Sequence, residues 1–191
     1  EKEYSSWQNS MQFMRNIVDD SEIDDEVRIC IEYNIPLTSK RVDFIIAGAD
    51  KSGKDNIIIV ELKQWQKAEV VADDMHYCVR TYVANSDRIV CHPSYQAYSY
   101  SCFLRNYSQS LTDDNINLIP CAYLHNYQPE YRQTLSNPIY QEWTELAPFF
   151  IKNEVCVFSE FVKKHITKKS SKGFFEKIYD KIVGKDHIAG D

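Results

Sequence analysis

One stretch decides the fold of this chain: residues 57–63, which read Ile-Ile-Ile-Val-Glu-Leu-Lys. Four β-branched residues in succession predict a strand that is buried on both faces, in the middle of a sheet. Side chains two apart on a strand point to the same face, so Glu61 and Lys63 share one side where this strand ends. At the mouth of a buried strand, a solvated surface pair is less expected than a site.

Two further extended segments precede this strand. Residues 27–35 alternate and end before Pro36, and residues 41–47 form a second run. The polar segment 48–56 contains two glycines, as expected for a hairpin connection between the second and third strands. The three segments therefore predict a meander of strands.

Helices are expected to pack against these strands. The other predicted elements are a helix over 6–19, extended pieces at 77–83 and 88–91, a long helix over 94–111, a strand over 115–124, short helical segments near 140–150, and helices from a Ser159 cap to Ile166 and over 174–182. The order helix, three strands, helix, strand predicts an α/β fold with a central mixed β-sheet flanked by helices (αβββαβ). The length of 191 residues suits a single domain, with a core at about 5–125 and a helical extension after it.

The composition of the chain excludes some classes of function and favours others. The net charge of -6 argues against a protein that coats nucleic acid by charge alone, although it allows a local basic groove. The six cysteines show no CxxC or zinc-like spacing, so we expect reduced, buried thiols in a cytoplasmic protein. No apolar stretch approaches the roughly 20 residues of a membrane span, and no signal peptide opens the sequence.

Asp43 completes a constellation with Glu61 and Lys63, in the pattern Asp-x17-Glu-x-Lys. Neighbouring antiparallel strands bring Asp43 beside Glu61, so that two carboxylates and one ammonium meet on one patch. Such oxygen ligands hold Mg²⁺ or Mn²⁺, and the Leu62 carbonyl is a further candidate ligand. The ion can polarise a phosphoryl oxygen, and the lysine can position or deprotonate the attacking water. The alternative is a surface Glu-x-Lys pair with an unrelated Asp on the next strand.

The order of these segments resembles a known superfamily. Arg41-Val-Asp-Phe-Ile-Ile, followed by Ile57-Ile-Ile-Val-Glu-Leu-Lys-Gln-Trp, is similar to the PD-(D/E)XK nucleases, and Gln96-Ala-Tyr-Ser-Tyr matches the Gln-x-x-x-Tyr signature of their RecB-like branch. The resemblance implies a restriction-endonuclease-like core and a metal-dependent nuclease that hydrolyses DNA, with RNA as the alternative substrate. It also implies catalytic roles for Gln96 and Tyr100, which are four apart and share a helix face.

A narrower resemblance covers roughly residues 5–125. The runs Ile31-Glu-Tyr-Asn-Ile-Pro-Leu-Thr-Ser-Lys-Arg-Val-Asp and His92-Pro-Ser-Tyr-Gln-Ala-Tyr-Ser-Tyr resemble the N-terminal domain of bacterial helicase-like ATPases, some of them linked to phage defence. The resemblance implies an ATPase domain beyond residue 191 of a longer parent chain, since the sequence itself contains no Gly-x-x-x-x-Gly-Lys-[Ser/Thr] motif.

The sequence departs from the superfamily pattern in two places. Val42 precedes the first carboxylate instead of Pro, and the helix over 6–19 contains no Glu to face the metal. The nearest substitutes are Glu3, Glu22 and Glu32, and none of them matches convincingly.

Five other residues are candidate nucleic-acid ligands, and each also has a purely structural explanation. Lys40 and Arg41 flank the site strand, and they either bind the phosphate backbone or form a solvated charge pair. His92 either contacts phosphate or caps the turn before its helix. Trp65 and Tyr95 are expected in the core rather than stacked on bases.

Two rival functions stay open. The first is a catalytically inert module that grips nucleic acid or a partner beside a motor domain, which the missing helix glutamate and the net charge of -6 favour. The second is an oligomerisation domain that associates through the helix over 174–182.

Overall fold

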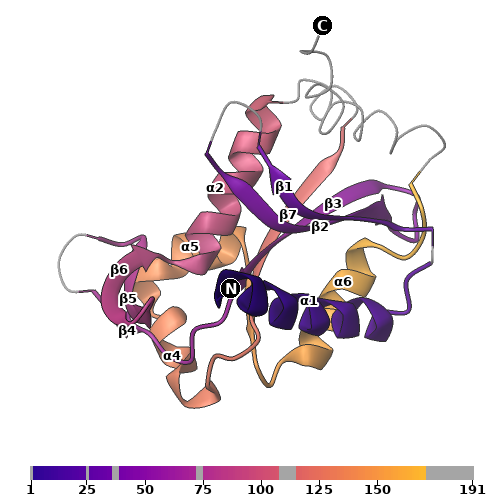
Figure 1. The fold of residues 1–191 in the computed structure, drawn as a ribbon. Helices are drawn as coiled ribbons and strands as arrows, with labels where there is room; N and C mark the ends of the chain where they lie inside the picture. The colour runs from indigo at the N-terminus through magenta and orange to yellow at the C-terminus, as the bar shows by residue number, and fades with distance from the viewer. Residues whose placement is uncertain (1, 25, 36–38, 72–74, 108–114, 171–191) are drawn as a thin grey trace, which may run out of the picture.

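The computed structural model describes residues 2–24, 26–35, 39–71, 75–107 and 115–170 (Figure 1). Its centre is a five-stranded sheet in the order β1-β2-β3-β7-β8. The strands are β1 (Arg28–Asn34), β2 (Arg41–Ala49), β3 (Asp55–Lys63), β7 (Asn117–Leu124) and β8 (Phe149–Ile151). The first three strands are antiparallel, whereas β7 and β8 run parallel to β3. The prediction of an α/β fold with a central mixed sheet is confirmed.

Helices cover both faces of this sheet. On one face, α1 (Lys2–Asp20) and α6 (Val155–His165) bury Met14, Ile17 and Phe158 against the sheet. On the other face, α2 (Pro93–Tyr107) buries Tyr100 and Leu104. The Ile57–Val60 run serves both layers, because alternate residues of β3 enter opposite cores. The strand is therefore buried on both faces, as its composition predicts.

A second, smaller sheet is inserted between β3 and α2. It consists of β4 (Glu69–Val70), β5 (Cys78–Val83) and β6 (Ser86–Cys91), which are antiparallel. Its inner face shares a core with Leu135 of the short helix α4 (Arg132–Leu135) and with Ile139 and Tyr140 of the 3-10 turn η2 (Pro138–Tyr140). The 3-10 turn η1 (Pro129–Tyr131) precedes α4, and the short helix α5 (Gln141–Leu146) follows η2. The extended pieces predicted at 77–83 and 88–91 are present, but their arrangement as a separate sheet was not predicted.

Three predicted elements differ from the structure or lie outside it. The segment near 140–150 is not all helical, because Phe149–Ile151 forms β8 on the open edge of β7. Ser159 does not cap a helix: α6 begins at Val155, and Ser159 is buried in its interior. The helix over 174–182 lies outside the described residues. The sheet and its core continue through α6, beyond the range 5–125.

Gly48 lies inside β2 and not in the connection that follows it. The chain after α6 crosses this strand, where Lys168 forms a bridge with Ala49. A Cβ at Gly48 would lie 2.7 Å from both the Ile166 side chain and the Lys168 carbonyl oxygen. Close backbone approach is thus the reason for glycine at this position.

None of the described helices is both long and apolar enough to cross a membrane.

Candidate active site

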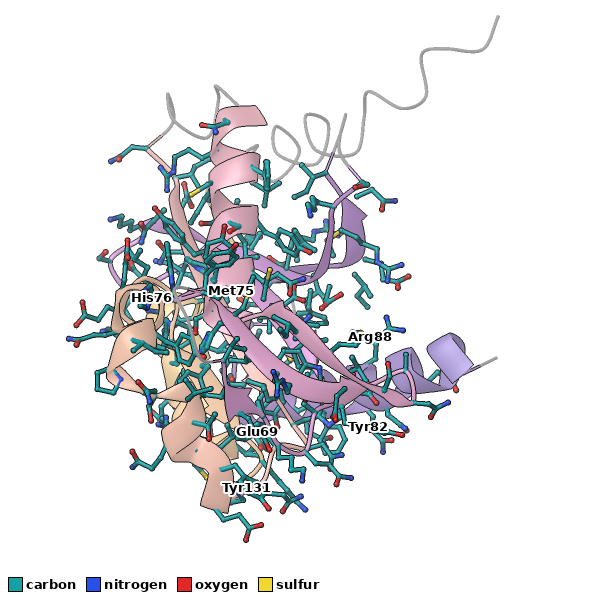
Figure 2. The ribbon with its side chains drawn as sticks, turned by 90° about the vertical axis from the view of Figure 1, so that its left-hand side faces the viewer. Glu69, Met75, His76, Tyr82, Arg88 and Tyr131 are labelled. Atoms are coloured by element: carbon teal, nitrogen blue, oxygen red, sulfur yellow. The ribbon has the colours of Figure 1, made fainter. Side chains whose placement is uncertain are left out.

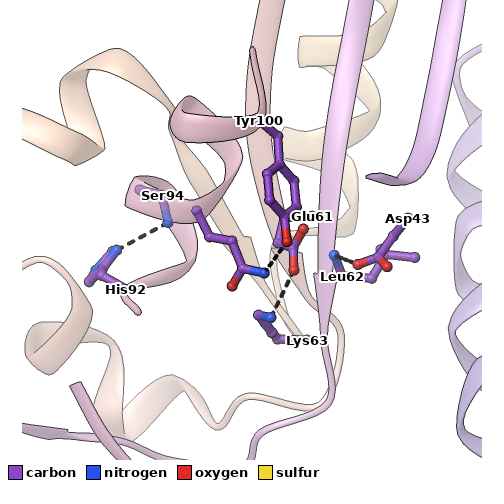
Figure 3. Close-up of polar contacts among 8 residues, drawn as sticks. Asp43, Glu61, Leu62, Lys63, His92, Ser94 and Tyr100 are labelled. Carbon is purple, nitrogen blue, oxygen red and sulfur yellow. Dashed lines mark hydrogen bonds and ion pairs between the residues drawn. The ribbon is translucent and has the colours of Figure 1, made fainter. Parts of the chain in front are cut away.

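The three residues of the Asp-x17-Glu-x-Lys pattern meet at one end of the sheet (Figure 3). Asp43 lies near the start of β2, and Glu61 and Lys63 lie at the end of β3, which runs antiparallel to β2. The register pairs Phe44 with Val60, so the next pair outward is Asp43 with Glu61. Glu61 continues the alternation of Ile57 and Ile59, which enter the core beneath α2, and Asp43 lines the same cleft as Glu61.

Two contacts fix this arrangement. The Lys63 ammonium lies 2.7 Å from Glu61 Oε1. The Leu62 amide donates a hydrogen bond to Asp43 Oδ2 over 2.9 Å. The N–H and C=O groups of a strand residue point to the same side, so the Leu62 carbonyl also faces β2 and the Asp43 carboxylate. Leu62 itself lines the cleft with both carboxylates, and its carbonyl stays a predicted ligand.

Burial dominates the electrostatics of the two carboxylates. Burial, together with a smaller effect of the Asp43 charge, raises the pKa of Glu61 to about 7 against the lowering effect of Lys63. Burial also raises the pKa of Asp43, while the Leu62 hydrogen bond and Lys63 lower it. For Lys63, burial lowers the pKa, but the pairing with Glu61 outweighs burial and the net shift is upward. Lys63 is thus held as a cation between acidic neighbours.

Glu61 keeps one oxygen without a protein partner. The Glu61 side chain is only 3% exposed, so its Oε2 is shielded from solvent, and this oxygen makes no hydrogen bond to any described residue. A buried carboxylate oxygen left in this state costs free energy unless a ligand satisfies it. A divalent cation between Glu61 and Asp43 would do so, and would add to the charge compensation that Lys63 and Arg41 provide.

The number of acidic groups restricts the kind of ion that fits. Within the described ranges, no three His, Cys, Asp or Glu side chains lie close enough together to form a metal cluster. Mg²⁺ is commonly held through one or two carboxylates and keeps several waters. Two carboxylates and a backbone carbonyl therefore fit a hydrated hard cation, and they do not fit zinc, which takes four protein ligands in a structural site.

Gln96 and Tyr100 face the same cleft from α2. Both line it together with Asp43, Glu61 and Lys63. Gln96 Nε2 donates to the Tyr100 hydroxyl over 2.8 Å. Because that hydroxyl oxygen accepts from Gln96, its own proton is directed to a different acceptor. All five residues predicted as catalytic are thus brought together, from three elements far apart in the sequence.

The three residues predicted to bind nucleic acid lie in different surroundings. Arg41 lines the cleft and pairs with Glu32, with 3.1 Å between Nη1 and Oε1. Lys40 is exposed beside it, outside the residues that line the cleft.

His92 is fully buried, so the prediction that it contacts nucleic acid is wrong. Its ring hydrogen-bonds the Leu135 carbonyl and the Ser94 amide. The His92 ring also packs on the Tyr140 ring, with 4.6 Å between the ring centroids. Burial lowers the pKa of His92 to about 4. His92 therefore anchors the start of α2 as a neutral side chain, which agrees with the alternative of a turn cap.

Trp65 lies in a core as expected, whereas Tyr95 is partly buried and outside the core clusters. Trp65 belongs to the core beneath the small sheet, with the Lys63 ammonium 5.6 Å from its ring centre. Tyr95 packs on Tyr77 and Trp143.

Glu32 reaches the site from β1, although the sequence showed only a weak reason to place it there. The register pairs Ile31 with Phe44 and Tyr33 with Val42, so Glu32 lies opposite Asp43. Its charge raises the pKa of Asp43, and its φ of 54° is unusual for a residue other than glycine inside a strand. The sequence named Glu32 only as a weak substitute for the missing helix glutamate, because its place opposite Asp43 depends on the strand register.

The cleft opens into a larger cavity of about 1170 Å³. The two share Arg41, Asp43, Leu62 and Lys63. Its far wall is the β5–β6 hairpin, where Tyr82 is 61% exposed, and Figure 2 shows Tyr82 and Arg88 at one end of the small sheet. The candidate site is therefore open to a substrate much larger than a single phosphate.

Comparisons with known proteins assign no family and no function to this site. No family model matches the chain, no curated protein matches it, and no solved structure matches its fold.

Proposed function

We propose that this chain is a divalent-metal-dependent phosphodiesterase that cuts DNA, built on a restriction-endonuclease-like core. One observation carries the proposal: Asp43, Glu61, Lys63, Gln96 and Tyr100 line a single cleft at the end of the central strand. Unrelated surface charges would not be expected to come from β2, β3 and α2 onto one patch with a buried, unpartnered carboxylate oxygen.

Asp43, Glu61 and the Leu62 carbonyl would hold the ion. When bound, Mg²⁺ or Mn²⁺ supplies Lewis acidity to a phosphoryl oxygen and lowers the pKa of a coordinated water. Both carboxylates must be ionised for this role, and Lys63 favours that state at each of them.

The protein groups supply the remaining steps of hydrolysis. Lys63 lies 2.7 Å from Glu61, so its ammonium can orient a water nucleophile beside that carboxylate and offset charge on the phosphate. Tyr100 can donate its free proton to a phosphate oxygen, while Gln96 fixes the orientation of that hydroxyl. Arg41 also lines the cleft, and its guanidinium can hold the flanking phosphate once Glu32 releases it.

Replacing Asp43 with Asn tests this proposal directly. The amide oxygen can still accept from Leu62, so the fold should persist, but the charge that holds the ion is lost. We expect Mn²⁺ binding by calorimetry to become undetectable and cleavage of labelled DNA to fall by about 10²-fold or more.

Glu160→Gln is the matched control, because it removes an exposed carboxylate on α6, on the opposite face of the sheet. Cleavage that depends on Mn²⁺ yet is equally fast in the Asp43→Asn and parent proteins would exclude this assignment.

The metal-free protein should lose stability as pH rises through neutrality. Glu61 titrates at about 7 in the folded state and at 4.5 in its reference state. Between these values the folded state holds a proton that the unfolded state has released, so increasing pH favours unfolding. The contribution is fully present below pH 4.5 and lost through about pH 7.

Thermal denaturation in a chelator at about pH 5 and about pH 8 measures this difference in Tm. We expect Glu61→Gln to flatten the decrease in Tm, and Mn²⁺ to restore Tm at the higher pH in the parent protein alone. An unchanged pH profile in Glu61→Gln would show that another group causes the dependence.

The competing proposal is an inert module that grips nucleic acid or a partner beside a motor domain. The lack of a three-membered metal cluster among the described residues favours it, as does the Glu32–Arg41 ion pair, which leaves less free positive charge at the cleft. DNA binding that is insensitive to both Mn²⁺ and Asp43→Asn, without cleavage, would select this alternative. A parent chain with an ATPase domain and a role in phage defence are compatible with either proposal.

A further inference from the structure

Two free cysteines lie directly opposite each other in the small sheet. Cys78 opens β5, and its register partner is Cys91, the last residue of β6. No other two cysteines are paired in the strand registers of the described residues. The sequence alone does not reveal this pairing, because no Cys motif links the two residues and their register depends on the β5–β6 turn.

The backbone pattern identifies the type of pair. The His92 amide donates to the Tyr77 carbonyl over 2.7 Å, which makes Tyr77 and His92 a hydrogen-bonded pair. Such pairs alternate along an antiparallel ladder with non-hydrogen-bonded pairs, so Cys78 and Cys91 form one of the latter. Their Cα atoms are then about 4.5 Å apart, within the range of about 4.4–6.8 Å that a disulfide spans. The thiols can therefore be joined with little backbone movement.

The surroundings give the two sulfurs different roles. Cys78 is buried, and burial together with the neighbouring Cys91 raises the pKa of its thiol. Cys91 is half-buried and therefore accessible to a small reagent. A thiolate formed at Cys91 would meet the reagent first, with Cys78 behind it as the resolving thiol.

We propose that Cys78 and Cys91 are a modification site, a thiol pair that low-molecular-weight disulfides convert reversibly to a cross-strand disulfide. The Cys91 thiolate attacks one sulfur of the reagent, forms a mixed disulfide and expels a thiolate. The Cys78 thiol then loses its proton and displaces the second reagent thiolate from Cys91. Two protein thiols are oxidised and one reagent disulfide is reduced to two thiols.

The bond would close the small sheet at the end that meets α2. The Cys78 carbonyl accepts from the Tyr140 hydroxyl over 2.7 Å, and Cys91 precedes the buried His92 that anchors α2. Met75 and His76 mark this end in Figure 2. The cross-link would thus stiffen the hairpin that forms the cavity wall, without requiring the cleft to be catalytic.

Oxidised glutathione added to the full chain tests the proposal. The background is Cys156→Ser, which removes the exposed thiol on α6. We expect the intact mass to fall by two hydrogens, peptide mapping to recover a Cys78–Cys91 link, and Tm to rise by several degrees. Dithiothreitol should reverse all three changes.

Single variants separate the two thiols. Cys78→Ser should stop at a glutathione adduct on Cys91, whereas Cys91→Ser should give neither link nor adduct at Cys78. If the oxidised protein instead carries glutathione on Cys91 with a free Cys78, or a link that maps to other cysteines, the proposal is overturned. These mass readouts are independent of nuclease activity, so they stand or fail apart from the function proposed above.

Discussion

Replacing Lys63 with Met is expected to lower DNA cleavage by about 10²–10⁴-fold while Mn²⁺ binding persists. The ammonium lies 2.7 Å from Glu61 and is not itself an ion ligand, so its loss removes proton transfer and charge compensation but leaves both carboxylates. Saturating cleavage rates and Mn²⁺ calorimetry, measured on the same preparation, separate the two effects. This outcome differs from that of Asp43→Asn, which should lose both properties together.

The metal-free Lys63→Met protein needs a stability control, because it leaves Glu61 buried without its cation. Measurement above neutral pH with saturating Mn²⁺ restores a counter-charge. Lys152→Met is the matched variant, since Lys152 is exposed in the turn before α6. An Lys63→Met protein that binds Mn²⁺ and cuts at the parent rate would remove Lys63 from the proposed chemistry.

Phe158→Ala is expected to have the largest effect on stability. Phe158 is completely buried where α6 covers the sheet. Its ring centroid lies 4.8 Å from that of Tyr123 and 4.7 Å from that of Phe150. Truncating a buried phenylalanine typically costs about 3–5 kcal/mol, because it loses apolar burial and leaves a cavity. For a domain of this size, Tm should fall by about 6–20 °C.

The neighbouring residue provides the control for this truncation. Val157 lies on the same helix but is 58% exposed, so Val157→Ala should change the free energy of unfolding by less than about 0.5 kcal/mol. Urea denaturation followed by circular dichroism measures both variants. Equal midpoints for the two would contradict the packing of α6 as the cover of this core.

The central strand and its site follow from local sequence. Four successive β-branched residues predict a strand buried on both faces even when the neighbouring strands are not known. The side-chain period of two then places Glu61 and Lys63 on the same face. A short connection between consecutive strands makes them antiparallel, which places Asp43 at the same end. Gln96 and Tyr100 share one helix face by spacing, and their direction into the cleft needed only α2 to pack where a crossover helix must.

Tertiary structure alone decided the rest. Phe149–Ile151 becomes a strand because the open edge of β7 is available to it, and three residues are too few for their β-propensity to be recognised beside a helical segment. His92 is buried because η2 and the chain from α4 close over it. Glu32 joins the site because the pairing of β1 with β2 places it opposite Asp43. Periodicity fixes which side chains share a face, whereas long-range packing fixes what covers that face.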